Sequence, residues 1–503
     1  MDHDAARPRY RLITYGCQMN KNDSERVAGL LNGLGFAPTD RDDEADVILV
    51  NTCSVRQSAE DRVFGHARAW KALKQKNPRL IVGVTGCLPG RDRNGAMRKK
   101  LAAVDLYFPI KDLPQLPRWI GELRPDLVNG TDAEEDYLKI RPMRPNVRQA
   151  FVTIQTGCNK FCTYCVVPFA RGLEKNRPLR DILEEVRGLV ERGCVEVTLL
   201  GQTVNSYRAP DPDSFSAANP FFQKSFVILS PSTSLRAGSA KDPSTGPSVA
   251  ALPQDDKRGD HFAALLWEID QIAGLKRLHF TAPHPLHMTD AVIEAMGLPA
   301  HVHYLHLPVQ SGSDAVLRRM NRRHTAAQYL DVIARVKKRH PTMAIGTDII
   351  VGFCGETVED YEQTAALYKE VGFDISYTAR YSPRSGTAAW RAFKDDVPRA
   401  EKKRRWDDLQ KIQEDVVLAK NQAYVGQTVS VLVERHEPPR VTEEMLAMPG
   451  NIVEQLKKKP GTCFGNSREM KLVSFPGGKD LVGQIVDVKI DKAEMWILYG
   501  RQA

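Results

Sequence analysis

Three cysteines, Cys158, Cys162 and Cys165, are the residues whose type and spacing most directly indicate chemistry. They follow a short apolar run, Phe151 to Ile154, that is typical of a strand. A [4Fe–4S] cluster needs thiolate ligands about one cubane edge apart, which a compact loop supplies. Three cysteines leave one iron without a protein ligand, and an open iron binds an amine and a carboxylate. The sequence therefore predicts a three-cysteine [4Fe–4S] site that binds S-adenosylmethionine (SAM).

A structural zinc loop is the alternative interpretation of these three cysteines. Structural zinc takes four protein ligands, usually cysteine and histidine. The sequence places no further cysteine or histidine close to the loop to complete such a set. Zinc is therefore the less favoured assignment.

A second group, Cys17, Cys53 and Cys87, has no local motif because its members are more than thirty residues apart. Each of these cysteines, however, lies a few residues after an apolar run that is typical of a buried parallel strand. Loops at the carboxyl ends of adjacent parallel strands converge in space. The three thiolates would then meet and hold a second cluster, whereas three unrelated buried cysteines are an equally open alternative.

The whole-chain properties limit the class of protein. The chain has 503 residues and a formal net charge of +9, which permits a polyanionic partner such as RNA without demanding one. The longest apolar runs are too short to cross a bilayer, and the acidic start at residues 1–4 does not resemble a signal peptide. We therefore expect a cytoplasmic protein without membrane contact. Its nine cysteines favour metal ligation over disulfides, with Cys194, Cys354 and Cys463 as packing residues.

The elements that must position these cysteines are predicted to form α/β domains. An N-terminal Rossmann-like α/β domain is expected over 9–125, with strands at Tyr10 to Thr14, Val47 to Val50 and Leu80 to Val84. A charged stretch over 126–148 is predicted to be a linker. About six β/α repeats over 149–398 predict a partial (β/α)6 barrel whose loops at the strand carboxyl ends carry the site.

Three further segments complete the predicted organisation. Residues 209–260, rich in Ser, Pro, Ala, Gly and Asp, are predicted to be a disordered insertion in the barrel. Residues 399–420 are predicted to form a connecting helix with an apolar stripe. Residues 421–502 alternate apolar and polar side chains, which indicates a small antiparallel all-β barrel or sandwich.

Several longer motifs resemble one known family along nearly the whole chain. They are Gly16 to Asn20, Asp23 to Glu25, Asn51 to Arg56, the cysteine loop through Gly172, Leu200 to Tyr207, His306 to Ser313 and Asp348 to Phe353. By these motifs the chain resembles the methylthiotransferase family of radical-SAM enzymes. The C-terminal segment 421–502 resembles the RNA-binding TRAM domain.

The resemblance implies two [4Fe–4S] clusters, with Cys17, Cys53 and Cys87 holding an auxiliary cluster that provides the sulfur. It implies two SAM molecules per turnover: one methylates the sulfur, and the other is cleaved at the Cys158 site to a 5′-deoxyadenosyl radical. The implied substrate is C2 of N6-isopentenyladenosine at position 37, in the tRNA anticodon stem-loop. An electron donor such as flavodoxin or ferredoxin and a sulfur source are implied partners. The SAM-contacting residues implied by the resemblance are Tyr164, Gly201, Gln202, Asp348 and Gly352.

The sequence also departs from the family pattern. Ala282 and Gly346 stand where serine is usual, Cys354 stands where proline is usual, and Leu88 to Arg91 replace a run of small residues and Gln. None of these departures removes a cluster ligand. Two alternatives to this function stay open. The chain could have the activity of the sister enzymes, which methylthiolate threonylcarbamoyladenosine in tRNA or an aspartate of a ribosomal protein. It could also be a non-catalytic RNA-binding iron–sulfur protein.

Overall fold

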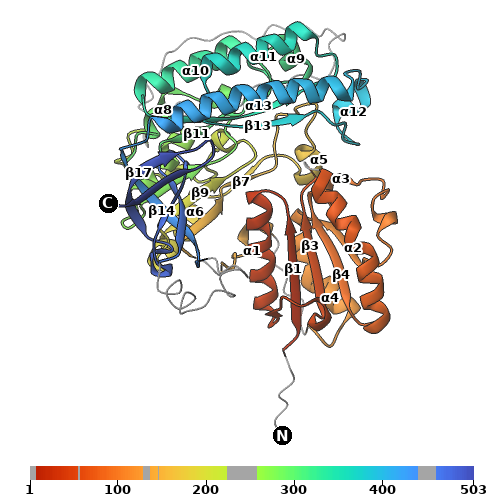
Figure 1. The fold of residues 1–503 in the computed structure, drawn as a ribbon. Coiled ribbons are helices and arrows are strands. Elements are labelled where there is room, and N and C mark those ends of the chain that lie inside the picture. Colours follow the sequence, from red (N-terminus) through yellow and green to blue (C-terminus); the bar gives the residue numbers. More distant parts are fainter. Residues whose placement is uncertain (1–6, 55–56, 129–135, 145–146, 224–257, 440–459) are drawn as a thin grey trace, which may run out of the picture.

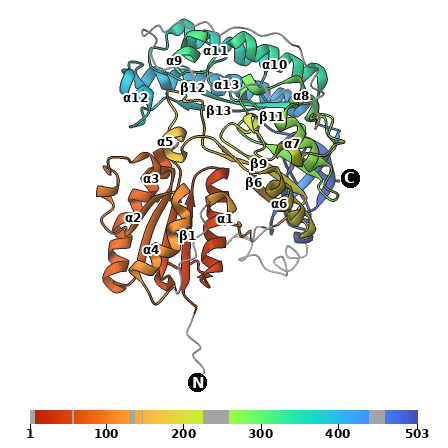
Figure 2. The ribbon, with the colours of Figure 1, turned by 180° about the vertical axis from the view of Figure 1, so that it is seen from behind.

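The computed structural model describes residues 7–54, 57–128, 136–144, 147–223, 258–439 and 460–503. Figure 1 and Figure 2 show an N-terminal α/β unit below, a larger α/β unit above it, and a small β-barrel against the larger unit. Among the described residues, no helix is both long and apolar enough to span a membrane.

The N-terminal unit is a five-stranded parallel sheet in the order β2-β1-β3-β4-β5. Its strands are β1 (Arg9–Tyr15), β2 (Ala37–Pro38), β3 (Val47–Thr52), β4 (Ile81–Gly86) and β5 (Leu106–Pro109). Its helices are α1 (Gln18–Gly33), α2 (Gln57–Lys76), α3 (Cys87–Arg91) and α4 (Leu116–Leu123), with 3₁₀ turns η1 (Asp42–Glu44), η2 (Arg98–Lys100) and η3 (Ile110–Gln115).

Alternation along β3 explains why helices cover both faces of this sheet. Val47 and Leu49 pack on the face that α1 and α4 cover, whereas Ile48 and Val50 pack on the face that α2 and α3 cover. Successive side chains of a strand point to opposite faces, so an uninterrupted apolar run needs cover on both sides. The Rossmann-like expectation is confirmed, and β2 and β5 are strands that the sequence analysis did not predict.

The larger unit contains six parallel strands in two hydrogen-bonded groups, β6-β9-β10 and β11-β12-β13. They are β6 (Gln149–Thr153), β9 (Glu196–Leu200), β10 (Arg277–Phe280), β11 (Tyr304–His306), β12 (Ala344–Val351) and β13 (Ile375–Arg380). A parallel bridge between Leu278 and His301 joins the two groups. Among the described strands β13 does not pair with β6, so the barrel is open there and the expected partial (β/α)6 architecture is confirmed.

Helices flank this partial barrel, and the short one after the cysteine loop lies toward the N-terminal unit (Figure 1). They are α5 (Val167–Arg171), α6 (Leu179–Glu191), α7 (His261–Asp270), α8 (Asp290–Ala295), α9 (Asp314–Arg319), α10 (Ala326–Arg339), α11 (Val358–Val371) and α12 (Ala388–Ala392). The short strands β7 (Gln155–Thr156) and β8 (Lys175–Asn176) pair antiparallel and bracket the cysteine loop. Short 3₁₀ turns complete it: η5 (Val204–Ser206), η6 (Pro212–Ser214) and η7 (Pro285–His287).

The predicted linker contributes to the N-terminal core. Within its described part, η4 (Tyr137–Lys139) buries Tyr137 and Leu138, and Ile140 is buried with them against α1 and α4. The sequence analysis saw only charge and proline here, because three apolar residues in an irregular stretch have no period to detect. Residues 129–135 and 145–146 lie outside the described residues.

The prediction of a disordered insertion over 209–260 is wrong for its first part. Phe215 and Phe222 are fully buried and contact each other, and His261 at the start of α7 packs edge-on against both rings. Asn219 donates a hydrogen bond to the Ala264 carbonyl at 3.0 Å. Two aromatic rings outweigh a composition typical of disorder because each buries a large apolar area. Residues 224–257 lie outside the described residues.

The C-terminal unit is a closed barrel in the order β14-β15-β16-β18-β17, reached through the long helix α13 (Arg399–Gln422). Its strands are β14 (Thr428–Glu437), β15 (Thr462–Ser467), β16 (Leu472–Pro476), β17 (Ile485–Ala493) and β18 (Leu498–Gln502), with η8 (Lys479–Leu481) between β16 and β17. A barrel of five strands cannot alternate direction all the way round, so one pair, β16 and β18, is parallel. The expected all-β barrel is confirmed, with this correction to its antiparallel character.

Two arginines, the buried Arg277 and the half-buried Arg468, attach this small barrel to the larger unit. Arg277, only 1% exposed at the start of β10, donates to the carbonyls of Ser430 and Asn466, each at 2.8 Å. Arg468 donates in the opposite direction to the carbonyls of Pro299 and His301, at 2.6 and 2.7 Å. Because charge-assisted bonds to backbone carbonyls are strong when buried, the barrel is docked and not loosely appended.

Candidate metal centres

Cys17, Cys53 and Cys87 lie together at one edge of the N-terminal sheet. They follow β1, β3 and β4, which are neighbours in the sheet. The residues that precede them are in register, since Tyr15 pairs with Thr52 and Thr52 pairs with Gly86. The sequence argument that adjacent strand ends bring these thiols together is therefore supported by the register of the sheet.

A network of buried amides fixes the backbone around this first group of thiols. Cys17 caps α1, and both its backbone N–H and its thiol lie 3.3 Å from Asn20 Oδ1. Asn20 in turn donates to Asn51 Oδ1 at 3.2 Å, and Asn51 donates back to the Asn20 carbonyl at 2.8 Å. Both asparagines are fully buried, so this pair couples the end of β3 to the start of α1.

Gly86 is required at the turn into Cys87. Its φ is +103°, and an added Cβ would meet the Thr52 carbonyl and lie 2.5 Å from Asn51 Oδ1. Only glycine adopts this conformation without strain, and only its missing side chain leaves room for the neighbouring strand end. The Gly86-Cys87 pair therefore allows Cys87 to begin α3 directly after the strand.

The electrostatic surroundings of Cys17 and Cys87 differ. A hydrogen bond with Cys53 lowers the pKa of Cys17 to about 6, with burial opposing and Arg171 assisting. Burial raises the pKa of Cys87, and the Arg171 guanidinium partly offsets that effect. Arg171 belongs to α5 of the larger unit, so a positive charge from one domain acts on the thiols of the other.

The second group of thiols lies in the loop between β7 and α5. Gly157, at φ +74°, turns the chain into the loop, and an added Cβ there would lie 2.7 Å from the Gly172 carbonyl oxygen. Backbone N–H groups of Lys160 and Val167 point at the sulfurs of Cys158 and Cys165, each at 3.4 Å. Such donors stabilise thiolates and cluster sulfurs.

Burial dominates the electrostatics of this loop. It raises the pKa of Cys158, and together with the nearby Cys162 it raises the pKa of Cys165 to about 12. Arg322 Nη1 lies 3.8 Å from Cys162 Sγ and supplies a buried positive charge. The thiols of Cys158 and Cys165 are therefore protonated at neutral pH, and iron must displace those protons when a cluster is bound.

Both groups suit a cubane cluster better than a single ion. Among the described residues, no three His, Cys, Asp or Glu side chains are close enough together to bind one metal ion. In a [4Fe–4S] cluster each thiolate binds a different iron, so its ligands stand farther apart than those of one zinc. At each site three thiols lie beside a guanidinium, Arg171 in the first group and Arg322 in the second, and the second group also has backbone N–H donors.

The five residues expected to contact SAM come from the cysteine loop, from the end of β9, and from β12 and the turn that follows it. Tyr164 is inside the cysteine loop, and burial together with Cys162 raises the pKa of its hydroxyl well above the ordinary value. Gly201 and Gln202 follow β9, and an added Cβ at Gly201 would lie 3.1 Å from Gln155 Oε1. Asp348 is on β12.

Asp348 and Gly352 each have a close side-chain neighbour in the protein. Asp348 Oδ2 lies 3.4 Å from His306 Nε2, and its side chain stays 41% exposed. Gly352 has φ +69°, and an added Cβ would lie 3.0 Å from Cδ of Lys402. The packing of Lys402 therefore explains why position 352 is glycine, and contact of these residues with SAM stays a prediction.

The sequence analysis missed several polar residues of the barrel site. Thr203 Oγ1 lies 3.3 Å from Cys158 Sγ, and Lys160 Nζ lies 2.6 Å from His287 Nε2. Arg322, which lies beside Cys162, was missed as well. The motif around Leu200 to Tyr207 contained Thr203, but neither Arg322 nor His287 belongs to a motif, and each reaches the loop only through the fold.

The departure at Gly346 has a local cause. An added Cβ at Gly346 would lie 2.7 Å from His306 Nδ1 and would also meet the Tyr304 hydroxyl. Tyr304 and His306 hydrogen-bond each other at 2.9 Å in that space. A glycine on β12 is therefore matched to the two bulky side chains of the neighbouring β11.

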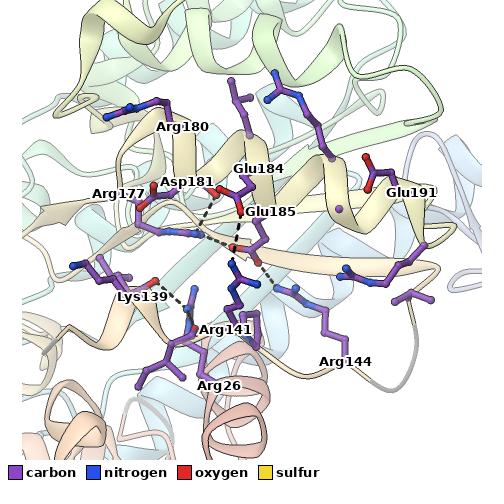
Figure 3. Close-up of a pocket in the computed structure, with 18 of the residues that line it drawn as sticks. Arg26, Lys139, Arg141, Arg144, Arg177, Arg180, Asp181, Glu184, Glu185 and Glu191 are labelled. Atoms are coloured by element: carbon purple, nitrogen blue, oxygen red, sulfur yellow. Dashed lines mark hydrogen bonds and ion pairs between the residues drawn. The ribbon is translucent and has the colours of Figure 1, made fainter. Parts of the chain in front are cut away.

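The two units are joined by ion pairs beside a cavity of about 1140 Å³ (Figure 3). Glu185 of α6 binds both Arg144 and Arg177, each at 2.6 Å, and Arg144 also binds Glu25 of α1 at 3.0 Å. Burial acts to raise the pKa of Glu185, but Arg177 and Arg144 hold it at about 2. None of the six cysteines lines this cavity, so we place the chemistry at the strand ends and not here.

Comparison with known proteins agrees with this domain order. Residues 9–109 match the model described as "Uncharacterized protein family UPF0004", residues 152–368 match the Radical SAM superfamily, and residues 452–502 match the TRAM domain. The tRNA-2-methylthio-N(6)-dimethylallyladenosine synthase of Clostridium botulinum (strain Okra / Type B1) is 37% identical over 495 residues, covering 97% of this chain and 96% of the relative. The synthase of the same name from Moorella thermoacetica is 36% identical over 503 residues, covering 98% of each chain.

The chain belongs to the radical-SAM methylthiotransferase family. The resemblance stated from the sequence motifs is thereby confirmed. Radical-SAM membership implies one [4Fe–4S] cluster and SAM, and the matched region includes the three closely spaced cysteines of the Cys158 loop.

A solved structure shares the fold of this methylthiotransferase. It is the radical S-adenosylmethionine methyltransferase TsrM from Kitasatospora setae with cobalamin and [4Fe-4S] cluster bound, with a TM-score of 0.52 at 12% identity. The similarity covers 76% of this chain and 77% of the other. At this identity the likeness supports the fold alone.

Proposed function

We propose that this chain transfers a methylthio group to C2 of N6-isopentenyladenosine at position 37 of tRNA. The observation that carries the proposal is the identity along nearly the whole chain to two enzymes named tRNA-2-methylthio-N(6)-dimethylallyladenosine synthase. The register that brings Cys17, Cys53 and Cys87 to one sheet edge supports it independently of those names.

In this proposal, Cys158, Cys162 and Cys165 hold the cluster that binds SAM. When bound, the cluster and SAM supply a radical able to take hydrogen from an unactivated aromatic carbon, which no side chain can do. The chain's own part is to hold the thiolates, through the N–H groups of Lys160 and Val167 and through Arg322.

We further propose that SAM lies against Tyr164, Gly201, Gln202 and Asp348, with Gly352 shaping the adjoining turn. Asp348 is suited to this position because its carboxylate is partly exposed at the barrel mouth and is oriented by His306. A carboxylate there can accept hydrogen bonds from ribose hydroxyls.

The N-terminal thiols are proposed to hold a second [4Fe–4S] cluster that provides the sulfur. The fit rests on three thiols at one sheet edge, one of them with a lowered pKa, beside the buried Arg171. The proposed partners are the tRNA anticodon stem-loop, an electron donor such as flavodoxin or ferredoxin, and a sulfur source. A cytoplasmic location and the absence of membrane contact remain predictions from the sequence.

The proposal is tested by mass spectrometry of tRNA nucleosides from a bacterial strain that has lost its own 2-methylthio activity. Expression of this chain should convert N6-isopentenyladenosine to its 2-methylthio derivative, and the Cys162→Ala variant should not. Methylthiolation of threonylcarbamoyladenosine instead would assign the chain to the sister activity. Unchanged nucleosides from a folded, iron-loaded protein would overturn the proposal.

A further inference from the structure

A buried ion pair crosses from the radical-SAM unit to the N-terminal unit beside the first group of thiols. Arg171 is the last residue of α5, and Asp23 lies on α1, six residues after Cys17. Arg171 Nη1 donates to Asp23 Oδ1 at 3.3 Å and Nη2 donates to Oδ2, and the side chains are 2% and 0% exposed. The two residues are 148 positions apart in the chain, so only the docked domains bring them together.

Further residues hold this pair in place. The Tyr137 hydroxyl donates to the same carboxylate, and the Arg26 guanidinium lies over the Tyr137 ring at 5.3 Å. Asp23 is therefore bound by donors from two other segments. A buried carboxylate with this many donors is firmly positioned, and so is the arginine it binds.

The packing of α5 against α3 brings Arg171 to the thiols. An added Cβ at Gly90, on the helix that begins with Cys87, would lie 2.9 Å from Cα of Ala170. The two short helices therefore touch through backbone, and Arg171 comes next in the chain after Ala170. The guanidinium acts on both Cys87 and Cys17 from there.

The stability of the fold does not by itself explain why this ion pair is buried at the domain interface. Removing two charges from water costs about as much as their attraction returns, so a buried pair is weak support for a fold. Three cysteine thiolates at one site carry like charges, and a nearby guanidinium compensates them. Hydrogen-bond donors and positive charge near a cluster also favour its more negative, reduced state.

We propose that Arg171, held by Asp23, is a positioning residue for the N-terminal cluster and brings it a positive charge from the radical-SAM unit. This inference rests on the second cluster of the proposed function. The N-terminal cluster then reaches its full occupancy and its working reduction potential only while the two units are docked. Loss of the arginine and loss of the aspartate have opposite electrostatic effects, because one removes the charge and the other removes its counter-charge.

The test uses the full chain with Cys158, Cys162 and Cys165 replaced by Ala, so that only the N-terminal cluster remains. Anaerobic reconstitution should give about four irons per chain. In this background, Arg171→Gln should lower the midpoint potential measured by EPR-monitored titration or reduce the iron content. Asp23→Asn should raise the potential, and Arg171→Lys should fall between Arg171→Gln and the parent.

A matched control separates this effect from loss of fold. Arg405 forms an equally buried pair with Glu356, at 3% and 2% side-chain exposure, that involves none of the six cysteines. Arg405→Gln should leave the potential and the iron content of folded protein unchanged. Potentials that do not respond to Arg171→Gln or Asp23→Asn, or that shift in the same direction, overturn the inference. A parent without iron overturns the second cluster itself, and this inference with it.

Discussion

At the residue scale, the N-terminal thiols should differ sharply in reactivity before iron is bound. The Cys17 thiol keeps access to solvent and, although the surrounding protein partly desolvates it, its pKa is lowered to about 6, whereas Cys87 is buried and its pKa is raised. The thiolate is the form that alkylating reagents attack. A thiol with a lowered pKa is already charged at neutral pH and loses that charge only when the pH falls below about 6.

We therefore predict that iodoacetamide modifies Cys17 of the apo-protein first. The rate should be nearly constant between pH 7 and pH 9, and it should fall as the pH drops through about 6. Peptide mass spectrometry of timed samples measures this rate, and Cys17→Ser should remove the fast phase. A rate that instead rises through pH 8 to 9 would show an ordinary thiol and contradict the assignment.

Gly86 gives a second prediction at this scale. Gly86→Ala forces a side chain into φ +103° against the end of β3, so it should destabilise the apo-protein by roughly 1–3 kcal/mol or more and displace Cys87. Thermal unfolding measures the change. Gly33→Ala is the matched control, since an added Cβ there meets nothing within 4 Å and alanine favours a helix by about 1 kcal/mol. Equal stability of the two variants would refute this role for Gly86.

At the element scale, residues 209–223 behave as part of the barrel core. Phe222 forms an antiparallel bridge with Gly259, and the Gln223 N–H donates to the Arg258 carbonyl at 2.7 Å. The chain therefore leaves and re-enters the described structure at adjacent points. Gln223 and Arg258 are therefore hydrogen-bonded neighbours, and the Phe215–Phe222 pair packs next to them.

This arrangement predicts different outcomes for two changes in the same segment. Replacing residues 224–257 by a short Gly-Ser linker should leave the melting temperature and iron content nearly unchanged, because Gln223 and Arg258 are already hydrogen-bonded to each other and a short linker can join them. Phe222→Ala should cost about 3–5 kcal/mol, as expected for a fully buried phenylalanine. Differential scanning calorimetry compares the two. Unfolding of the linker variant would mean that the excised residues are structurally required.

At the scale of the whole molecule, the two proposed cluster sites lie on separate units and should fail independently. The proposed barrel ligands come from one loop, whereas the proposed N-terminal ligands come from three strand ends. The pair that Arg171 forms with Asp23 lies beside the N-terminal thiols and not beside those of the Cys158 loop. Loss of one cluster should therefore not remove the other.

We predict an asymmetric result for two single substitutions. Cys53→Ala should abolish methylthiolation of tRNA yet still allow reductive cleavage of SAM to 5′-deoxyadenosine, because the barrel cluster keeps its three ligands. Cys162→Ala should abolish both activities. Anaerobic assays with dithionite, read by liquid chromatography and mass spectrometry, measure each product. Normal methylthiolation by Cys53→Ala would exclude the N-terminal site as the sulfur donor.

The sequence by itself determined the features that depend on nearby residues. The cysteine loop at 158–165 and the apolar strands could be predicted, because a three-ligand loop and a buried strand are each encoded within a few consecutive positions. The convergence of Cys17, Cys53 and Cys87 could be anticipated only as one of two alternatives, since it depends on which strands are neighbours.

Only the tertiary structure decided the contacts between distant residues. Arg171 contacts Asp23 across 148 positions of the chain, and Arg322 contacts Cys162 across 160 positions. The burial of Phe215 and Phe222 and the parallel β16–β18 pair are likewise invisible to local patterns. The physical reason is that hydrogen bonds, ion pairs and aromatic packing depend on distance in space, and a single sequence gives distance along the chain alone.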